Sequence, residues 1–108
     1  MYETITQRKI KFALVGCGRI ANNHFGALEA LQDDCELVAV CDINPAHLQA
    51  AVERTQAQGY AHYAQMLAET DADIIIITTP SDLHPEQAVQ ALQPGFYVIT
   101  AKPLAPRL

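Results

Sequence analysis

The chain has 108 residues, of which 50% are hydrophobic and 18% are charged, and its formal net charge is -5. Such a chain is expected to bury one hydrophobic core, because it is too apolar and too weakly charged for an intrinsically disordered protein. Nucleic acid and anionic membrane surfaces require clustered Lys and Arg, whereas the few basic residues here are scattered, so neither is expected as a partner.

Short apolar runs alternate with longer segments of helical period along the chain. The apolar runs predict strands over residues 10–15, 36–41, 60–62, 73–78 and 96–100. The periodic segments predict helices over residues 20–31, 44–52, 64–69 and 84–92. This alternation is typical of βαβ units, so we expect an α/β fold: a Rossmann-type, doubly wound parallel sheet.

The run of four isoleucines at residues 74–77 is apolar on both faces. A strand in a half-exposed sheet would instead alternate apolar and polar residues. We therefore expect this strand to lie inside the sheet, with helices covering both of its faces.

Residues 102–108 contain two prolines and show no apolar period. A doubly wound dinucleotide-binding fold normally has a sixth strand and usually a partner domain that carries substrate groups. Neither fits after residue 100. We therefore expect residues 1–108 to be a dinucleotide-binding domain truncated before an α/β substrate domain.

A glycine-rich turn, GCGRIA at residues 16–21, follows the first predicted strand and opens the first predicted helix. In dinucleotide-binding folds the glycine at the position of Gly16 allows the sharp turn, and the one at Gly18 lets backbone N–H groups approach a pyrophosphate. Ala21 is small enough for close packing of helix on strand. The helix N-terminus attracts phosphate, and Arg19 either adds charge or faces solvent.

Asp42 ends the second predicted strand, near the spacing of about 20 residues that the dinucleotide fingerprint has for its acidic residue. A carboxylate at this position accepts hydrogen bonds from the adenosine ribose and opposes a 2'-phosphate. The next residues, Ile43, Asn44 and Pro45, supply no cation. The sequence thus favours NAD over NADP, with a turn carboxylate that caps the segment around Asn44 as the alternative for Asp42.

Two further segments leave predicted strands at the same edge of the sheet, where open α/β sheets bind ligands. In the first, Thr79 and Pro80 precede His84, which either caps the next helix or lies near the reactive end of the cofactor. In the second, Lys102 follows the last strand. This lysine donates a hydrogen bond to a substrate hydroxyl, or takes part in proton transfer if burial lowers its pKa, or is an ordinary solvated side chain.

Four motifs occur in a fixed order: FALVGCGRIANNHFGAL, LVAVCDINP, ADIIIITTPSDLHPEQAVQAL and GFYVITAKPLA. Together they resemble the N-terminal domain of the Gfo/Idh/MocA oxidoreductases, over residues 10–105. The segment SDLHPEQAVQAL also resembles dehydrogenases of UDP-N-acetyl-glucosaminuronate. The resemblance implies an NAD- or NADP-dependent enzyme that moves hydride between the nicotinamide and a carbon of a sugar, sugar nucleotide or polyol.

By this resemblance, the pyrophosphate loop consists of Gly16, Gly18, Arg19 and Ile20, and Asp42 binds the adenosine ribose. Thr79, Pro80 and His84 match the loop beside the cofactor. Lys102 matches the lysine of a Glu-Lys-Pro motif that lies close to nicotinamide and substrate, which makes it the candidate catalytic residue.

The chain departs from the family pattern in two ways. Ala101 replaces the glutamate of the Glu-Lys-Pro motif, which puts the orientation and the pKa of Lys102 in doubt. The family's second catalytic group lies in the substrate half and has no counterpart here. We therefore expect cofactor binding, and no turnover by the 108-residue chain alone.

Two other functions are left open by the residues. The first is a non-catalytic nucleotide-binding or interaction module. The second is an S-adenosylmethionine-dependent methyltransferase, which also uses a glycine-rich first turn, although the AKPLA ending argues against it. An uncovered sheet edge leaves a homo-oligomer open as well.

The remaining features predict a cytoplasmic protein without a metal site. No stretch approaches the ~20 apolar residues of a membrane span, and the opening residues MYETITQRK lack the apolar core of a signal peptide. Cys17, Cys35 and Cys41 form no CxxC pair, so they indicate neither a zinc site nor a disulfide framework.

Overall fold

The computed structural model of the chain describes residues 9–79 and 84–100, with only the backbone described at residues 19, 20, 22, 23 and 84. Strands and helices alternate, as the sequence predicts. The elements in chain order are β1 (Ile10–Val15), α1 (Arg19–Ala30), β2 (Cys35–Cys41), α2 (Pro45–Thr55), β3 (Gln58–Tyr60), α3 (Tyr63–Glu69), β4 (Ile74–Ile77), α4 (His84–Leu92) and β5 (Tyr97–Thr100).

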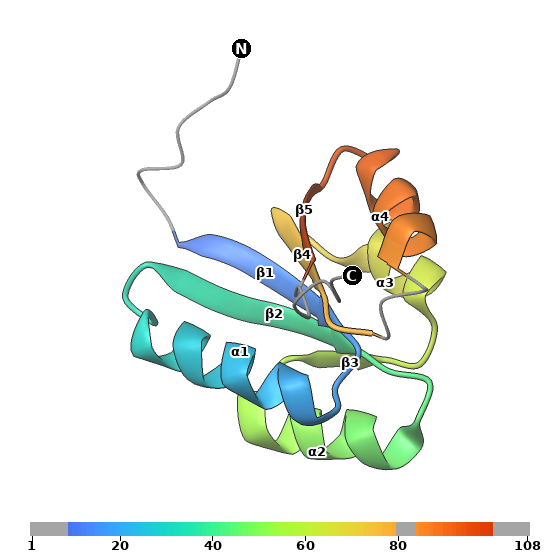
Figure 1. Cartoon of the computed structure of the whole chain (residues 1–108). Helices are drawn as coiled ribbons and strands as arrows, with labels where there is room; N and C mark the ends of the chain where they lie inside the picture. The colour runs from blue at the N-terminus through green and yellow to red at the C-terminus, as the bar shows by residue number, and fades with distance from the viewer. Residues whose placement is uncertain (1–8, 80–83, 101–108) are drawn as a thin grey trace, which may run out of the picture.

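All five strands form one parallel sheet in the order β3-β2-β1-β4-β5 (Figure 1). The chain winds outward from β1 to β3 and then crosses back to add β4 on the other side of β1. Val15, at the end of β1, is paired with Cys41 in β2 and with Ile77 in β4. This is the Rossmann-type α/β order, and the winding direction reverses between β1 and β4.

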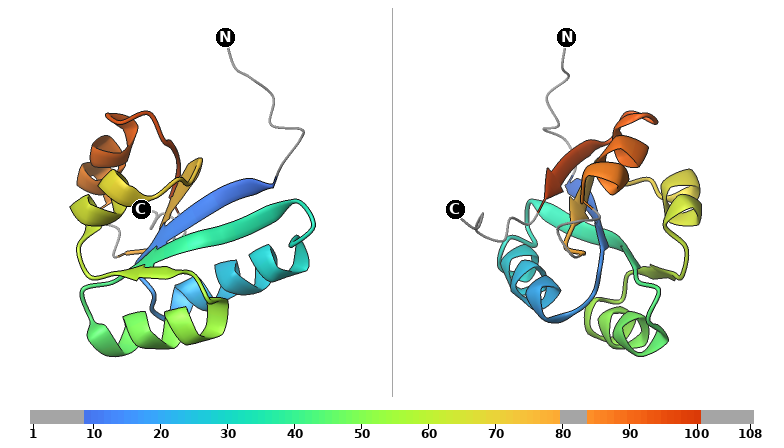
Figure 2. Two further views of the ribbon diagram at one scale, coloured as in Figure 1. Left: turned by 180° about the vertical axis from the view of Figure 1, so that it is seen from behind. Right: turned by 45° about the vertical axis from the view of Figure 1, so that its right-hand side comes forward.

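Two layers of helices cover the sheet, and each encloses its own part of the core (Figure 2). On one face α1 and α2 pack through Phe25 and Ala51, against Leu14 and Val40 among others. On the other face α3 and α4 contribute Met66 and Ala91 to a second cluster, with residues of β1, β2 and β4. The core therefore lies on both sides of the sheet.

Strand β4 occupies the inner position that its run of isoleucines predicts. Ile75 and Ile77 belong to the core cluster under α3 and α4, whereas Ile76 belongs to the cluster under α1 and α2. All three are at least 96% buried, since their exposed fractions are 0%, 0% and 4%. A polar residue at any of these positions would face a helix layer rather than water.

Strand β3 lies earlier in the chain than the sequence predicts. It covers Gln58–Tyr60, and its pairing with β2 ends where Tyr60 meets Cys41. The predicted segment, residues 60–62, instead leads into α3, whose N-cap is His62. Gly59 is close to α2: an added Cβ would lie 2.7 Å from Cγ2 of Val52. The position of β3 in the chain is therefore determined by packing against α2 rather than by the β propensity of its residues.

No helix within residues 9–79 and 84–100 is long and apolar enough to cross a membrane. The longest, α1, has 12 residues.

Candidate functional site

A pocket of about 420 Å³ opens at the carboxyl ends of the strands, beside the point where the winding direction reverses. Its lining comes from the end of β1, the glycine turn, the β2–α2 connection, the start of α3, the end of β4 and α4. Ligands of open α/β sheets bind in this position. Of the predicted site residues, the structure brings Gly16, Gly18, Asp42 and Thr79 together here.

Gly16 makes the turn out of β1 and has no room for a side chain. Its φ is +92°, in the region that favours glycine, and an added Cβ would lie 2.7 Å from the backbone nitrogen of Thr79. The Gly16 N–H donates to the carbonyl of Cys41 at 2.8 Å. The first glycine of the motif thus allows the β1, β2 and β4 ends to meet.

Gly18 is the N-cap of α1 and faces open space, because an added Cβ would meet nothing within 4 Å. No side chain within the described residues caps this helix, and its first turn contains no acidic residue. By contrast, the side chain of Asn44 caps α2 by accepting hydrogen bonds from the N–H groups of Ala46 and His47. The free space and uncapped N–H donors at the start of α1 fit a pyrophosphate.

Asp42 connects the glycine turn to the start of α2. Its Oδ2 accepts a hydrogen bond from the Cys17 N–H at 2.7 Å, and its Oδ1 accepts one from the Asn44 N–H at 2.8 Å. The second bond is the turn interaction that the sequence left open as an alternative. The side chain is only 11% exposed, yet it lines the pocket. A carboxylate held in this way is fixed in orientation, and its oxygens can accept further hydrogen bonds from a ligand in the pocket.

The end of β4 closes the floor of the pocket. The Thr78 hydroxyl donates to the carbonyl of Val15 at 2.9 Å and also bonds the carbonyl of Gly16. The Thr79 hydroxyl bonds the side-chain oxygen of Gln87 in α4. These contacts attach β4 and α4 to the glycine turn.

Two buried thiols lie at the glycine turn: Cys17 belongs to the turn and Cys41 ends the neighbouring strand β2. Burial, followed by the negative charge of Asp42, raises the pKa of Cys17 to about 12 and that of Cys41 to about 11. The Cys17 thiol donates to the carbonyl of Cys41 at 3.4 Å. Both thiols therefore stay protonated at neutral pH, which makes them poor nucleophiles and metal ligands.

The other predicted site residues are described in part or not at all. Arg19, Ile20 and His84 lie at the starts of α1 and α4, with only their backbone described. Pro80 and Lys102 lie outside the described residues.

Sequence reasoning did not assign several residues that line the pocket to the site, among them His47, Tyr63 and Gln87. The Tyr63 hydroxyl donates to the backbone carbonyl of Gln87 at 2.8 Å, and burial raises the pKa of Tyr63 to about 12. His47 sits in the first turn of α2, three residues after a recognisable cap. The sequence could have identified His47, because Asp42 directly follows a predicted strand and the next helix begins so soon after it that residues of its first turn lie near the carboxylate.

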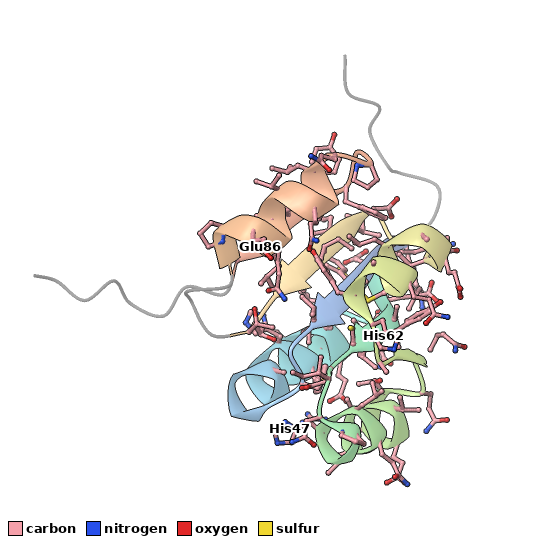
Figure 3. All side chains as sticks on the ribbon, turned by 90° about the vertical axis from the view of Figure 1, so that its right-hand side faces the viewer. His47, His62 and Glu86 are labelled. Atoms are coloured by element: carbon pink, nitrogen blue, oxygen red, sulfur yellow. The ribbon has the colours of Figure 1, made fainter. Side chains whose placement is uncertain are left out.

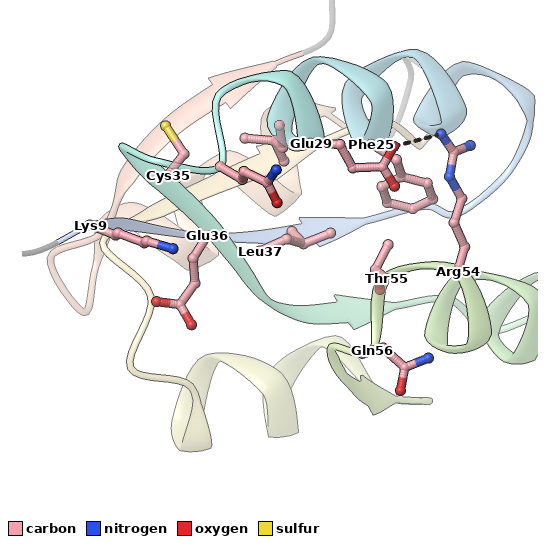
Figure 4. Close-up of a pocket in the computed structure, with 11 residues that line it drawn as sticks. Lys9, Phe25, Glu29, Cys35, Glu36, Leu37, Arg54, Thr55 and Gln56 are labelled. Carbon is pink, nitrogen blue, oxygen red and sulfur yellow. Dashed lines mark hydrogen bonds and ion pairs between the residues drawn. The ribbon is translucent and has the colours of Figure 1, made fainter.

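A second pocket, of about 380 Å³, lies at the opposite end of β2, between α1 and α2 (Figure 4). Arg54, which lines this pocket, pairs with Glu29 at 3.4 Å and lies 5.6 Å from the centre of the Phe25 ring. These contacts join the two helices. In the described part of the chain, no group of three or more His, Cys, Asp and Glu could hold a metal ion.

Residues 10–108 match the family model of the Gfo/Idh/MocA oxidoreductases, described as an oxidoreductase family with an NAD-binding Rossmann fold. The inositol 2-dehydrogenase of Salmonella typhimurium is 36% identical over 98 residues, which cover 89% of this chain and 29% of that protein.

Two solved structures are also similar to the chain. The WlbA dehydrogenase from Chromobacterium violaceum, in complex with NADH and UDP-GlcNAcA, is 63% identical with a TM-score of 0.94, and the match covers 99% of this chain and 31% of that one. The WlbA dehydrogenase from Bordetella pertussis, with the same ligands, is 48% identical with a TM-score of 0.88, over 90% and 29% of the two chains.

The chain thus spans less than a third of the length of these relatives. The matches do not favour a methyltransferase or a non-catalytic module. Both the ordered motifs and the fold agree with the family match, and the chain belongs to the Gfo/Idh/MocA oxidoreductases, with the NAD-binding Rossmann fold of that family.

Proposed function

We propose that the chain is the nucleotide-binding part of an NAD-dependent dehydrogenase that transfers hydride between the nicotinamide and a hydroxyl-bearing carbon of a sugar-type substrate. One observation carries this proposal: Gly18 and the carboxylate of Asp42 line the same pocket. Gly18 stands at a helix start that no described side chain caps, and nothing lies within 4 Å of a Cβ added to it. This combination matches the needs of a dinucleotide, whose pyrophosphate and ribose must be bound side by side.

In this proposal each part of the pocket binds one part of NAD. Gly16, Gly18 and the backbone of Arg19 and Ile20 hold the pyrophosphate, because N–H groups at a helix start attract anions. Asp42 accepts hydrogen bonds from the adenosine ribose. Its charge opposes a 2'-phosphate, so NAD is preferred over NADP.

The remaining predicted residues belong to the reactive end of the site. The Thr79 hydroxyl is hydrogen-bonded to Gln87 in α4, so the segment between β4 and α4 begins at the pocket. This supports a role for Thr79, Pro80 and His84 beside the nicotinamide. Lys102 follows β5 and would then orient or deprotonate the reacting hydroxyl, while bound NAD supplies the hydride acceptor. We expect the substrate groups to come from a second α/β domain that follows residues 1–108.

UDP-N-acetyl-glucosaminuronate is the substrate we favour within the sugar class. Two similar structures, 63% and 48% identical, are complexes with UDP-GlcNAcA. A cytoplasmic location belongs to the same proposal, because Cys17, Cys35 and Cys41 are all free thiols, as expected in a reducing compartment.

A substitution at Gly18 tests nucleotide binding without disturbing the fold. Because its φ is -83° and nothing lies within 4 Å of an added Cβ, Gly18→Ala should fold normally while its methyl group occupies the space needed by the pyrophosphate. We expect NADH fluorescence titration to show at least about tenfold weaker binding, about 1.4 kcal/mol. The free energy of unfolding should fall by no more than about 1 kcal/mol, because alanine is a poorer N-cap residue than glycine.

Gly26→Ala is the matched control, since Gly26 lies on the same helix and an added Cβ would be 3.9 Å from Nη2 of Arg54, an ordinary contact. This variant should bind NADH like the wild type. Absence of saturable NADH binding by the wild-type chain, or equal affinity of Gly18→Ala and wild type, would contradict the proposed site.

A further inference from the structure

His47 faces the carboxylate that we assign to the ribose. It lies in the first turn of α2, where Asn44 fixes the backbone by accepting its N–H at 3.1 Å. Its Nδ1 is 3.6 Å from Oδ2 of Asp42, and its side chain is 53% exposed. Figure 3 shows His47 beside α2. The imidazole therefore lines the pocket and remains accessible to a nucleotide and to protons from solvent.

Few groups decide the charge of this part of the pocket. Among the described side chains that line it, Asp42 is the carboxylate, and the other titratable groups are His47, Cys41 and Tyr63. Burial raises the pKa of Cys41 to about 11 and that of Tyr63 to about 12, so both are neutral at physiological pH. Cys17, whose N–H bonds Asp42, also keeps its thiol proton because burial raises its pKa to about 12.

Among the described side chains, the charge beside the proposed ribose position therefore depends on Asp42 and His47. With a neutral imidazole, the local charge is that of the carboxylate, which repels a 2'-phosphate. With a protonated imidazole, the pair has no net charge, and the imidazolium donates hydrogen bonds that phosphate oxygens accept. Histidine is the side chain that ordinarily changes charge between about pH 5 and pH 8.

We propose that His47 is a second determinant of nucleotide choice, which keeps the pocket selective for NAD when the imidazole is neutral and admits the 2'-phosphate of NADP when it is protonated. The ratio of the NADP⁺ dissociation constant to the NAD⁺ dissociation constant then becomes smaller as the pH falls. This inference rests on the proposed function, because it requires the adenosine ribose to lie beside Asp42.

The experiment compares dissociation constants of NAD⁺ and NADP⁺ by calorimetry, at about pH 8.5 and about pH 6 and at constant ionic strength. From the higher to the lower pH, the ratio of the NADP⁺ constant to the NAD⁺ constant should fall about fivefold in the wild type, the upper effect of one exposed charge pair. In His47→Gln it should fall less than about twofold, which is the part due to titration of the 2'-phosphate itself.

Two further variants sharpen the test. His47→Arg has a permanent cation, so its ratio at about pH 8.5 should already approach that of the wild type at about pH 6. His62→Gln is the matched control. This histidine is exposed and precedes α3 (Figure 3). It does not line the pocket, so the full pH dependence should remain.

Equal pH dependence in the wild type and His47→Gln would overturn this inference while leaving the proposed function intact. Failure of the wild type to bind either nucleotide would overturn both.

Discussion

Gly16 carries two separate restrictions, and only one of them is visible in the sequence. The sequence predicts a glycine here because the chain must turn sharply out of the strand, and the structure shows this glycine with a positive φ of +92°. The second restriction is the approach of Thr78 and Thr79, whose backbone would lie within 3 Å of an added Cβ. That contact joins residues far apart in the chain, so no local pattern could predict it.

Substitution of two glycines separates these restrictions. Gly95 also has a positive φ, +103°, but nothing lies within 4 Å of an added Cβ. Gly95→Ala should therefore lower the free energy of unfolding by about 1 kcal/mol, the cost of the left-handed backbone alone. Gly16→Ala adds a backbone clash and should cost at least about 3 kcal/mol.

Urea unfolding followed by circular dichroism measures both losses. Equal losses for the two variants would mean that the segment containing Thr78 and Thr79 moves aside easily and does not restrain the turn.

At the scale of elements, the best predicted parts are those with strong local signals. The start of α2 was predicted from Asn44 and Pro45, and the structure has Asn44 as N-cap and Pro45 as the first helical residue. Strand β3 was predicted two residues too late, because Gln58 and Gly59 have little preference for strands. Its position follows from pairing with β2 and from contact with Val52, both of which are tertiary interactions.

The candidate site divides in the same way. Gly16, Gly18 and Asp42 could be predicted because a strand-turn-helix unit is local in sequence. Tyr63 and Gln87 could not, since they come from α3 and α4 and reach the pocket only through the fold.

The cap of α2 gives an element-scale prediction. Asn44→Ala removes the acceptor for two N–H groups and should lower the free energy of unfolding by about 1 kcal/mol. Asn44→Asp keeps a capping oxygen and should stay within about 0.5 kcal/mol of the wild type. Thermal unfolding of the three proteins checks this, and an equal loss in both variants would show that the cap contributes nothing specific.

For the whole molecule, the free energy of unfolding should fall at alkaline pH, because two thiols and a phenol that can lose a proton are buried. Burial raises the pKa of Cys17 from 9.0 to about 12, that of Cys41 from 9.0 to about 11 and that of Tyr63 from 10.0 to about 12. At a pH between the ordinary pKa and the raised pKa of such a group, the unfolded chain has lost a proton that the folded chain still binds. The free energy of unfolding must then fall as the pH rises.

We expect this loss to begin near pH 9 and to continue to about pH 12. Urea unfolding at several pH values across this range measures the slope. Cys41→Ala removes one of the three groups and should give a shallower slope, whatever its stability at neutral pH. A stability that is constant from pH 9 upward would contradict the assignment of these groups as buried and protonated.

The hydroxyl of Thr78 also has a consequence for the order of folding. It bonds the carbonyls of Val15 and Gly16, which lie 63 and 62 residues earlier in the chain. Contacts of such long separation form late, because closing the intervening loop costs entropy before any contact repays it. β1, β2 and β3 can associate first, but the nucleotide pocket is complete only after β4 has docked on β1. Recovery of NADH binding during refolding should therefore lag behind the recovery of helical circular dichroism.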